Sequence, residues 1–103
     1  MIREIAILNI IPGREAEFEQ AFDEAREIIA SMPGHRVHRL ERSMENPSRY
    51  LLVVWWESLE DHTVGFRNSP EYQRWRALLH DFYDHMPEVE HFETVFGIQE
   101  SAD

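Results

Sequence analysis

The spacing of apolar residues changes along this chain in an order that few folds satisfy. Two spacings occur: alternation, which is typical of a β-strand, and recurrence every three or four residues, which places side chains on one stripe of a helix. Alternating or continuously apolar segments occupy residues 2–11, 35–42, 49–56 and 89–98, and helical spacing occupies residues 14–32 and 70–86. The sequence therefore predicts a strand, a helix, two strands, a second helical region and a last strand.

Local start and stop signals support these boundaries. Pro12-Gly13 ends the first strand, and Pro33-Gly34 ends the first helix. Ser58 with Asp61 three residues later resembles a helix capping box, and Ser69-Pro70 is an N-cap followed by proline at the first helical position. A short helix is therefore expected before the long one.

This order of elements is the α+β, split βαβ arrangement of the ferredoxin-like fold, in which right-handed crossovers place the helices on one face of an antiparallel sheet. The opposite face carries bulky groups such as Val53 and Trp55, and a soluble monomer rarely leaves such an apolar patch in water. A second sheet should cover it, so we expect a homodimer that forms a dimeric α+β barrel. One domain is expected over residues 1–99, followed by a loose tail over residues 100–103.

Composition excludes several classes of function. Twenty acidic residues against ten basic ones give a formal charge of -10, which repels phosphate backbones and anionic lipid head groups, so we expect no nucleic-acid and no membrane partner. The basic residues are all Arg, and there is no Cys, which excludes lysine Schiff bases, thiol nucleophiles and thiolate metal sites. The amino-terminal apolar run contains Glu4 and has no cleavage site, which favours a cytoplasmic protein.

Three short stretches resemble a known family: Trp56-Glu57-Ser58, Asn68-Ser69-Pro70-Glu71-Tyr72 and Val89-Glu90-His91-Phe92. With these motifs and its strand order, nearly the whole chain resembles the antibiotic biosynthesis monooxygenase family. The resemblance implies a dimeric α+β barrel. Some members oxygenate aromatic polyketides or quinols without metal or flavin and others degrade haem, so family resemblance alone leaves the reaction open.

Position by position, the resemblance implies three candidate catalytic residues. Trp56 and Arg76 stand where oxygenating members have a Trp at the end of the third strand and an Arg in the long helix. His62 and Leu52 stand where those members have a Tyr and an Asn. Trp56 would stack on a planar substrate, Arg76 would hold an oxyanion and His62 would move a proton. The structural alternatives are a core tryptophan, a surface ion pair and a solvated histidine.

We expect Leu52, Phe66, Tyr72 and Phe82 to join Trp56 in a substrate pocket. The first hypothesis is a monooxygenase-like protein that needs no cofactor and acts with molecular oxygen on a small aromatic, phenolic or quinol compound. The alternative is a non-catalytic small-molecule-binding or regulatory barrel whose pocket is packed shut. A third interpretation, a haem-binding or haem-degrading relative, rests on the number of histidines.

The histidines near the end of the predicted long helix raise a metal hypothesis. His80 with Asp84, and Asp81 with His85, are each four residues apart. The two pairs lie on adjacent faces, so one ion would not contact all four groups, and we expect helix capping and ion pairing rather than a metal site.

The remaining histidines lie in predicted strands. His35 and His38 are three residues apart, a spacing that points to opposite faces of a strand. His91 lies in the last strand, where a hydrogen-bonded structural role is favoured over a catalytic one.

Overall fold

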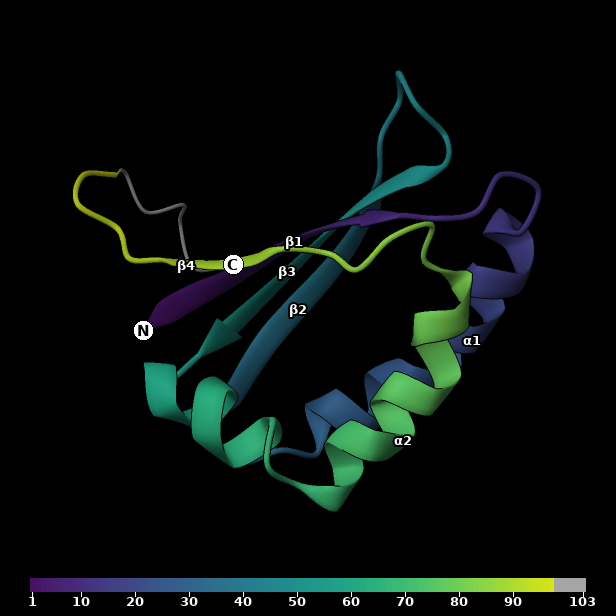
Figure 1. Cartoon of the computed structure of the whole chain (residues 1–103). Helices are drawn as coiled ribbons and strands as arrows, with labels where there is room; N and C mark the ends of the chain where they lie inside the picture. The colour runs from purple at the N-terminus through teal and green to yellow at the C-terminus, as the bar shows by residue number, and fades with distance from the viewer. Residues whose placement is uncertain (98–103) are drawn as a thin grey trace.

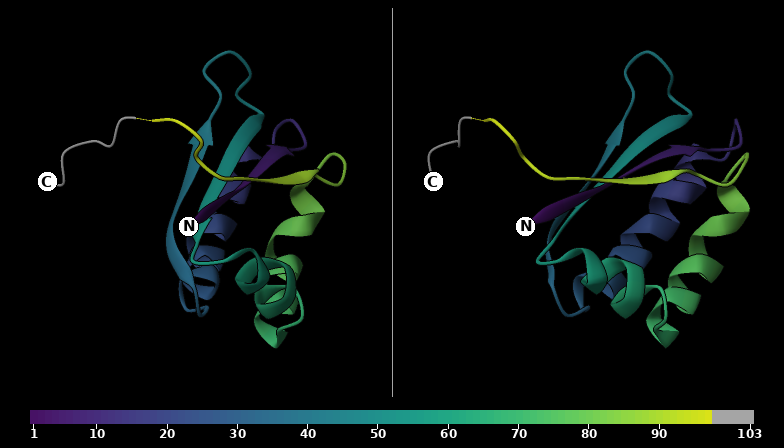
Figure 2. Two further views of the ribbon diagram at one scale, coloured as in Figure 1. Left: turned by 90° about the vertical axis from the view of Figure 1, so that its left-hand side faces the viewer. Right: turned by 60° about the vertical axis from the view of Figure 1, so that its left-hand side comes forward.

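The protein, described here by a computed structural model over residues 1–97, is built on one antiparallel sheet. The strands lie in the order β2-β3-β1-β4, and Figures 1 and 2 show the helices on one side of them. The elements are β1 (Ile2–Asn9), α1 (Glu15–Ala30), β2 (His35–Arg42), β3 (Arg49–Trp56), the π-type turn η1 (Asp61–Phe66), α2 (Pro70–Leu79), the 3₁₀ turn η2 (His80–Phe82) and β4 (Val89–Phe92). The predicted ferredoxin-like α+β fold is confirmed.

The core forms where the helix-facing side of the two central strands meets the apolar stripes of the helices. β1 pairs with β3 so that Ala6 lies opposite Leu52, and both side chains are almost fully buried. Helix α1 contributes Phe18 and Phe22, and α2 contributes Trp75, whose ring lies edge-on to Phe22 at 5.8 Å. Because these aromatic groups fill the layer between sheet and helices, polar groups on the same face of the sheet are also taken out of water.

The last third of the chain differs from the predicted boundaries. Helix α2 ends at Leu79 instead of continuing to residue 86, because the backbone that follows pairs with the end of β1. Phe82 accepts a 2.9 Å hydrogen bond from the Ile11 amide, and the Asp84 amide donates a 2.7 Å hydrogen bond to Asn9. The last strand is shorter than expected, ending at Phe92, and the tail expected over residues 100–103 lies outside the described residues.

A break in the β2–β3 register corrects the expected placement of two histidines. The register shifts between His35 and Val37, and this bulge turns His35 toward the side of the sheet on which His38 lies. Nε2 of His35 is 2.9 Å from Nδ1 of His38. The expectation that these two side chains point to opposite faces is therefore wrong.

The other face of the sheet carries no helix within the described part of the chain (Figure 1). Val53 is only 7% exposed there, and the Arg39 guanidinium lies 5.7 Å over the half-buried Trp55 ring. Ile7, Val37 and Phe92 remain 42%, 47% and 41% exposed. Across residues 1–97, no helix has the length and apolar character needed to cross a membrane.

Candidate functional site

A cavity of about 270 Å³ lies between the helix-facing side of the sheet and the segment that runs from η1 through α2 to the start of β4. Its apolar wall includes Leu52 from β3, Phe66 from η1 and Trp75 from α2. Its polar groups are Glu4, His62, Arg67, Tyr72, His80 and Tyr83. An aromatic cavity with a few convergent polar groups is the usual form of a small-molecule site.

Glu4 is the acidic group of this cavity. Strand alternation places it on the same face of β1 as Ala6 and Leu8, and it is 5% exposed. Its Oε1 accepts a 3.0 Å hydrogen bond from the indole N–H of Trp56. Burial raises the pKa of Glu4 to about 6, although the Trp56 hydrogen bond and the charge of Arg67 act in the opposite direction.

His62 faces Glu4 from the η1 turn. Ser58 begins this turn by accepting a 3.3 Å hydrogen bond from the Asp61 amide, as the capping pattern predicted. His62 is 2% exposed, and its Nε2 lies 3.3 Å from Oε1 of Glu4. Its ring stacks on Trp56 with centroids 5.5 Å apart. Burial, with smaller contributions from Arg67 and His91, lowers the pKa of His62 to about 3.

His91 completes this polar group from β4. Its Nε2 lies 2.8 Å from Nδ1 of His62, because the pairing of β4 with β1 sets His91 opposite Glu4. The ring is half-buried, and burial lowers its pKa. Glu4, His62 and His91 thus come from three separate elements, and His62 contacts both of the other two.

Some of the pocket residues expected from the sequence line the cavity, and others lie behind its wall. Leu52, Phe66 and Tyr72 line the cavity with His62. Trp56 is fully buried and is not among the residues that line the cavity. His62 stacks on its ring, and the Phe66 ring lies 5.9 Å from it, so these two side chains stand between Trp56 and the cavity. Its indole N–H is committed to Glu4.

Two other candidates lie elsewhere. Arg76 is exposed on α2 and is not among the residues that line the cavity. Phe82 packs at the far end of the core, with its ring 6.0 Å from that of Phe18 and the Arg14 guanidinium 4.5 Å above it. The cationic group at the cavity is Arg67, which directly follows η1.

The sequence analysis missed Glu4 and Arg67 as site residues. A signal for Glu4 was available: it is the one carboxyl on the helix-facing side of β1, in register with Ala6 and Leu8. Arg67 carries no such signal, because η1 is an irregular turn whose side-chain directions do not follow a fixed period. Tyr83 was missed because it was assigned to the long helix.

The expected helical pairs around His80 do not form. Residues 80–82 adopt a 3₁₀ turn, so His80 and Asp84 do not share a helix face. His80 instead lines the cavity, and burial lowers its pKa. His85 lies on the surface, 4.0 Å from Asp84. Within residues 1–97, no group of three or more His, Cys, Asp or Glu side chains is arranged to hold a metal ion.

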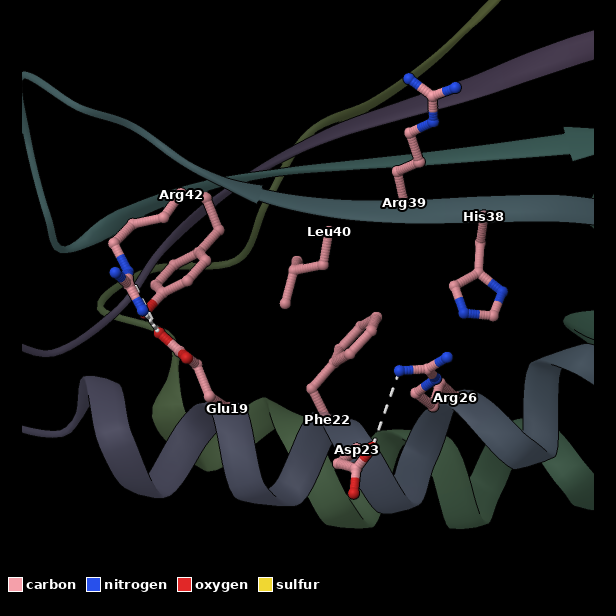
Figure 3. A pocket seen from close by; sticks show the side chains of 9 residues that line it. Glu19, Phe22, Asp23, Arg26, His38, Arg39, Leu40 and Arg42 are labelled. Atoms are coloured by element: carbon pink, nitrogen blue, oxygen red, sulfur yellow. Dashed lines mark hydrogen bonds and ion pairs between the residues drawn. The ribbon is translucent and has the colours of Figure 1, made fainter.

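A second hollow of about 430 Å³ lies between α1 and β2 (Figure 3). Figure 3 shows Arg42 reaching toward Glu19 and Arg26 toward Asp23, and both contacts are ion pairs. All but Glu19 of these charged side chains belong to exposed residues. Because these four charges are already paired and three of them belong to exposed residues, this hollow offers less to a reacting substrate than the cavity that contains Glu4.

Comparison with known proteins places the chain in a family. The model of the antibiotic biosynthesis monooxygenase family matches residues 1–78. YczJ, an uncharacterised protein of Bacillus subtilis, is 56% identical over 95 residues, which cover 92% of this chain and all of YczJ. A Bordetella bronchiseptica structure that carries the same family name is 41% identical, covers 92% of this chain and 97% of its own, and has a TM-score of 0.88.

The fold also extends to a more distant structure. SnoaB of Streptomyces nogalater, described as a cofactor-independent oxygenase, has a TM-score of 0.83, covers 96% of this chain and 97% of its own, and is 19% identical. At that identity the likeness concerns the fold. Since the family model covers most of the chain and two proteins above 40% identity match nearly all of it, the chain belongs to the antibiotic biosynthesis monooxygenase family.

Proposed function

We propose that this protein is a monooxygenase-like enzyme that uses molecular oxygen, without a metal or flavin, on a small aromatic, phenolic or quinol compound. The observation that carries the proposal is the buried Glu4–His62 pair in the wall of a cavity that is also lined by aromatic and aliphatic side chains. Removing a proton from a phenol requires a base within reach of its hydroxyl group. The description of SnoaB as a cofactor-independent oxygenase on the same fold supports this choice of chemistry.

Glu4 accepts the substrate proton in this proposal. With a pKa of about 6, its carboxyl is ionised at neutral pH yet more basic than an exposed glutamate. His62 stays uncharged beside it, because burial disfavours the imidazolium. The Arg67 guanidinium, which lines the cavity although Arg67 is an exposed residue, stabilises the substrate anion.

An anthrone-type phenol illustrates the electron balance. Loss of one proton to the base leaves an anion with electron density on a ring carbon, and that carbon forms a bond to molecular oxygen. The resulting peroxide anion takes a proton back from the base to become a hydroperoxide, which loses water and leaves a carbonyl group. One oxygen atom enters the product, the other leaves as water, and the substrate itself supplies the electrons, so no external reductant is needed.

Cavity size limits the substrate. A volume of about 270 Å³ lies just below the roughly 300–1,000 Å³ of typical small-molecule sites. We therefore propose a compound that has either a single ring or two or three fused rings. Tyr72 and His80 lie edge-on to each other at 6.5 Å and would contact the end of such a compound that lies away from Glu4.

We also propose that two copies of the chain pair through the outer face of the sheet. Ile7, Val37 and Phe92 expose 42%, 47% and 41% of their surfaces there. Large apolar side chains exposed on one face of a sheet favour its use as an interface. The paired sheets would form the dimeric α+β barrel expected from the sequence.

Oxygen uptake tests the enzymatic proposal. The purified protein is mixed with hydroquinones, naphthols and an anthrone-type phenol, and product mass is measured with ¹⁸O₂. We expect uptake above the uncatalysed rate, incorporation of one labelled atom, and a large loss of turnover in Glu4→Gln. Absence of turnover across the panel, combined with quenching of tryptophan fluorescence by the same compounds, would support the binding-module alternative instead.

A further inference from the structure

Glu4, His62 and His91 form a line of contacts that leads from the wall of the cavity to the edge strand of the sheet. Oε1 of Glu4 lies 3.3 Å from Nε2 of His62, and Nδ1 of His62 lies 2.8 Å from Nε2 of His91. Glu4 and His62 are almost fully buried, whereas His91 is half-buried on β4, the edge strand. Only the last of the three groups, His91, is therefore partly open to water.

The chemistry of the three groups fixes where their hydrogens lie. An ionised carboxylate only accepts hydrogen bonds, and a neutral imidazole has one donor and one acceptor nitrogen. When Glu4 is ionised, its 3.3 Å approach to Nε2 therefore favours the His62 tautomer that carries its hydrogen on Nε2 and accepts at Nδ1. His91 must then donate from its own Nε2, which leaves its Nδ1 as the acceptor nitrogen.

This arrangement is that of a proton relay, and we propose that Glu4 exchanges its proton with solvent through His62 and His91. A proton that binds Nδ1 of His91 releases the hydrogen on Nε2 of His91 to Nδ1 of His62. His62 in turn releases its Nε2 hydrogen to Glu4. Each imidazole gains one N–H bond and loses another, so both end neutral, and the reverse sequence returns a proton from Glu4 to water.

The surrounding charges favour transfer over storage of the proton. Burial and, to a smaller extent, the charge of Arg67 lower the pKa of both His62 and His91, so neither ring holds a second proton for long. Tyr83 also lines the cavity, and burial raises its pKa, so it remains a neutral phenol. The 3.3 Å separation between Glu4 and His62 is typical of catalytic contacts that shorten when substrate binds.

The relay rests on the proposed function only for its use in catalysis. In that use, Glu4 passes on the proton taken from a phenol while substrate still fills the cavity. The relay itself is a property of the protein without substrate, and it can be measured without turnover.

Nuclear magnetic resonance of ¹⁵N-histidine protein tests the relay. We expect both His62 and His91 to carry hydrogen on Nε2 at pH 8, and the His62 N–H to exchange with water through His91. His91→Gln supplies a side-chain amide that donates to His62 but cannot pass on a proton. It should keep the His62 tautomer and slow this exchange by roughly 100-fold, the lower end of what positioned proton transfer contributes.

Two further variants make the result specific. Imidazole added to His91→Ala should speed the exchange, because the free base can occupy the vacated position. His85→Gln, which alters an exposed histidine outside the line, should exchange at the wild-type rate. Hydrogen on Nδ1 of His62, or wild-type exchange in His91→Gln, would overturn the relay.

The relay and the proposed function can fail separately. His91-dependent exchange without turnover on any phenol would refute the proposed enzyme and leave the relay intact. Turnover by a protein whose exchange is unaffected by His91→Gln would refute the relay and leave the enzyme intact.

Discussion

The indole N–H of Trp56 donates a 3.0 Å hydrogen bond to Oε1 of Glu4 and joins the end of β3 to the start of β1. The two strands pair so that Glu4 lies opposite Val54, which makes Trp56 its diagonal neighbour on the helix-facing side. The same indole ring stacks on His62. Trp56 therefore positions both members of the buried acid–base pair.

Replacing Trp56 with Phe should destabilise the protein mainly through this hydrogen bond. A hydrogen bond to a charged group contributes about 1.5–3 kcal/mol, and the buried carboxylate would lose its donor. We expect the free energy of unfolding, measured with urea at pH 8, to fall by about 2 kcal/mol. The loss should be smaller at pH 5, where Glu4 is protonated. Trp55→Phe on the other sheet face serves as the control, and an equal loss there would contradict this account.

The pH dependence of stability should reveal the pKa of Glu4. Its pKa is raised from 4.5 to about 6, so the folded state holds this proton more tightly than the unfolded state. The resulting stabilisation is complete below pH 4.5 and is lost as pH rises through about 6, with an amplitude of about 2 kcal/mol. Glu4→Gln should lack this loss.

His62 affects the pH dependence of stability in the opposite direction to Glu4. Its pKa is lowered from 6.5 to about 3, so stability associated with His62 falls as pH decreases below 6.5. Subtracting the Glu4→Gln profile from the wild-type profile removes the part that His62 contributes to both. A difference profile that is flat between pH 4 and 7, in urea titrations at each pH, would contradict the raised pKa of Glu4.

Arg67 and Arg76 should differ in their effects on turnover. Removing one donor from an enclosed oxyanion site costs about 100-fold or more, and the exposure of Arg67 reduces that effect. We therefore expect Arg67→Ala to lower kcat about tenfold. Arg74 is exposed on α2, as Arg76 is. The kcat of Arg74→Ala therefore shows the effect of removing an arginine that has no proposed role. A larger loss in Arg76→Ala than in Arg67→Ala would return the anion-binding role to Arg76.

A charge placed on the outer sheet face should separate the proposed dimer. Ile7 is 42% exposed on β1, and a buried unpaired carboxylate at an interface is strongly unfavourable. Light scattering should report a dimeric mass for wild type and a monomeric mass for Ile7→Glu at the same concentration. Val64→Glu introduces the same charge on η1, at a side chain that is 55% exposed, and should stay dimeric. A monomeric wild type would refute the dimer.

Two glycines offer a matched test of how η1 is held in place. Gly13 and Gly34 have φ values of +94° and +86°, so alanine is strained at both. A Cβ at Gly13 would meet nothing within 4 Å, whereas one at Gly34 would lie 2.2 Å from the Asp61 carboxylate. We expect Gly34→Ala to lose about 1–3 kcal/mol more stability than Gly13→Ala, since Asp61 and η1 must shift. Equal losses of stability in the two variants, measured by thermal unfolding, would show that the Asp61 side chain moves away at no measurable cost.

The fold was predictable because each element carries its own periodic pattern. The continuous apolar run around Leu52 and the helical spacing around Phe18 required only local sequence. The end of α2 was not predictable in this way, because the segment after Leu79 leaves the helix to pair with Asn9, far away in sequence. The bulge at His35 likewise depends on pairing with β3.

The candidate site was only partly predictable for the same reason. Position within the family suggested His62 and Leu52, the expectation of an aromatic pocket suggested Tyr72, and all three line the cavity. No local pattern shows that Glu4 meets His62, because that contact depends on how η1 crosses the end of the sheet. Arg67 became a candidate only once the turn geometry was known.

The line from Glu4 to His91 joins residues that are almost the whole described chain apart. Closing contacts over such separations carries a large loop-closure entropy and generally occurs late in folding. We therefore expect the hairpin of β2 and β3 and helix α1 to form before this acid–base group is assembled. We expect the time at which the His62–His91 contact recovers during refolding to report when β4 pairs with β1.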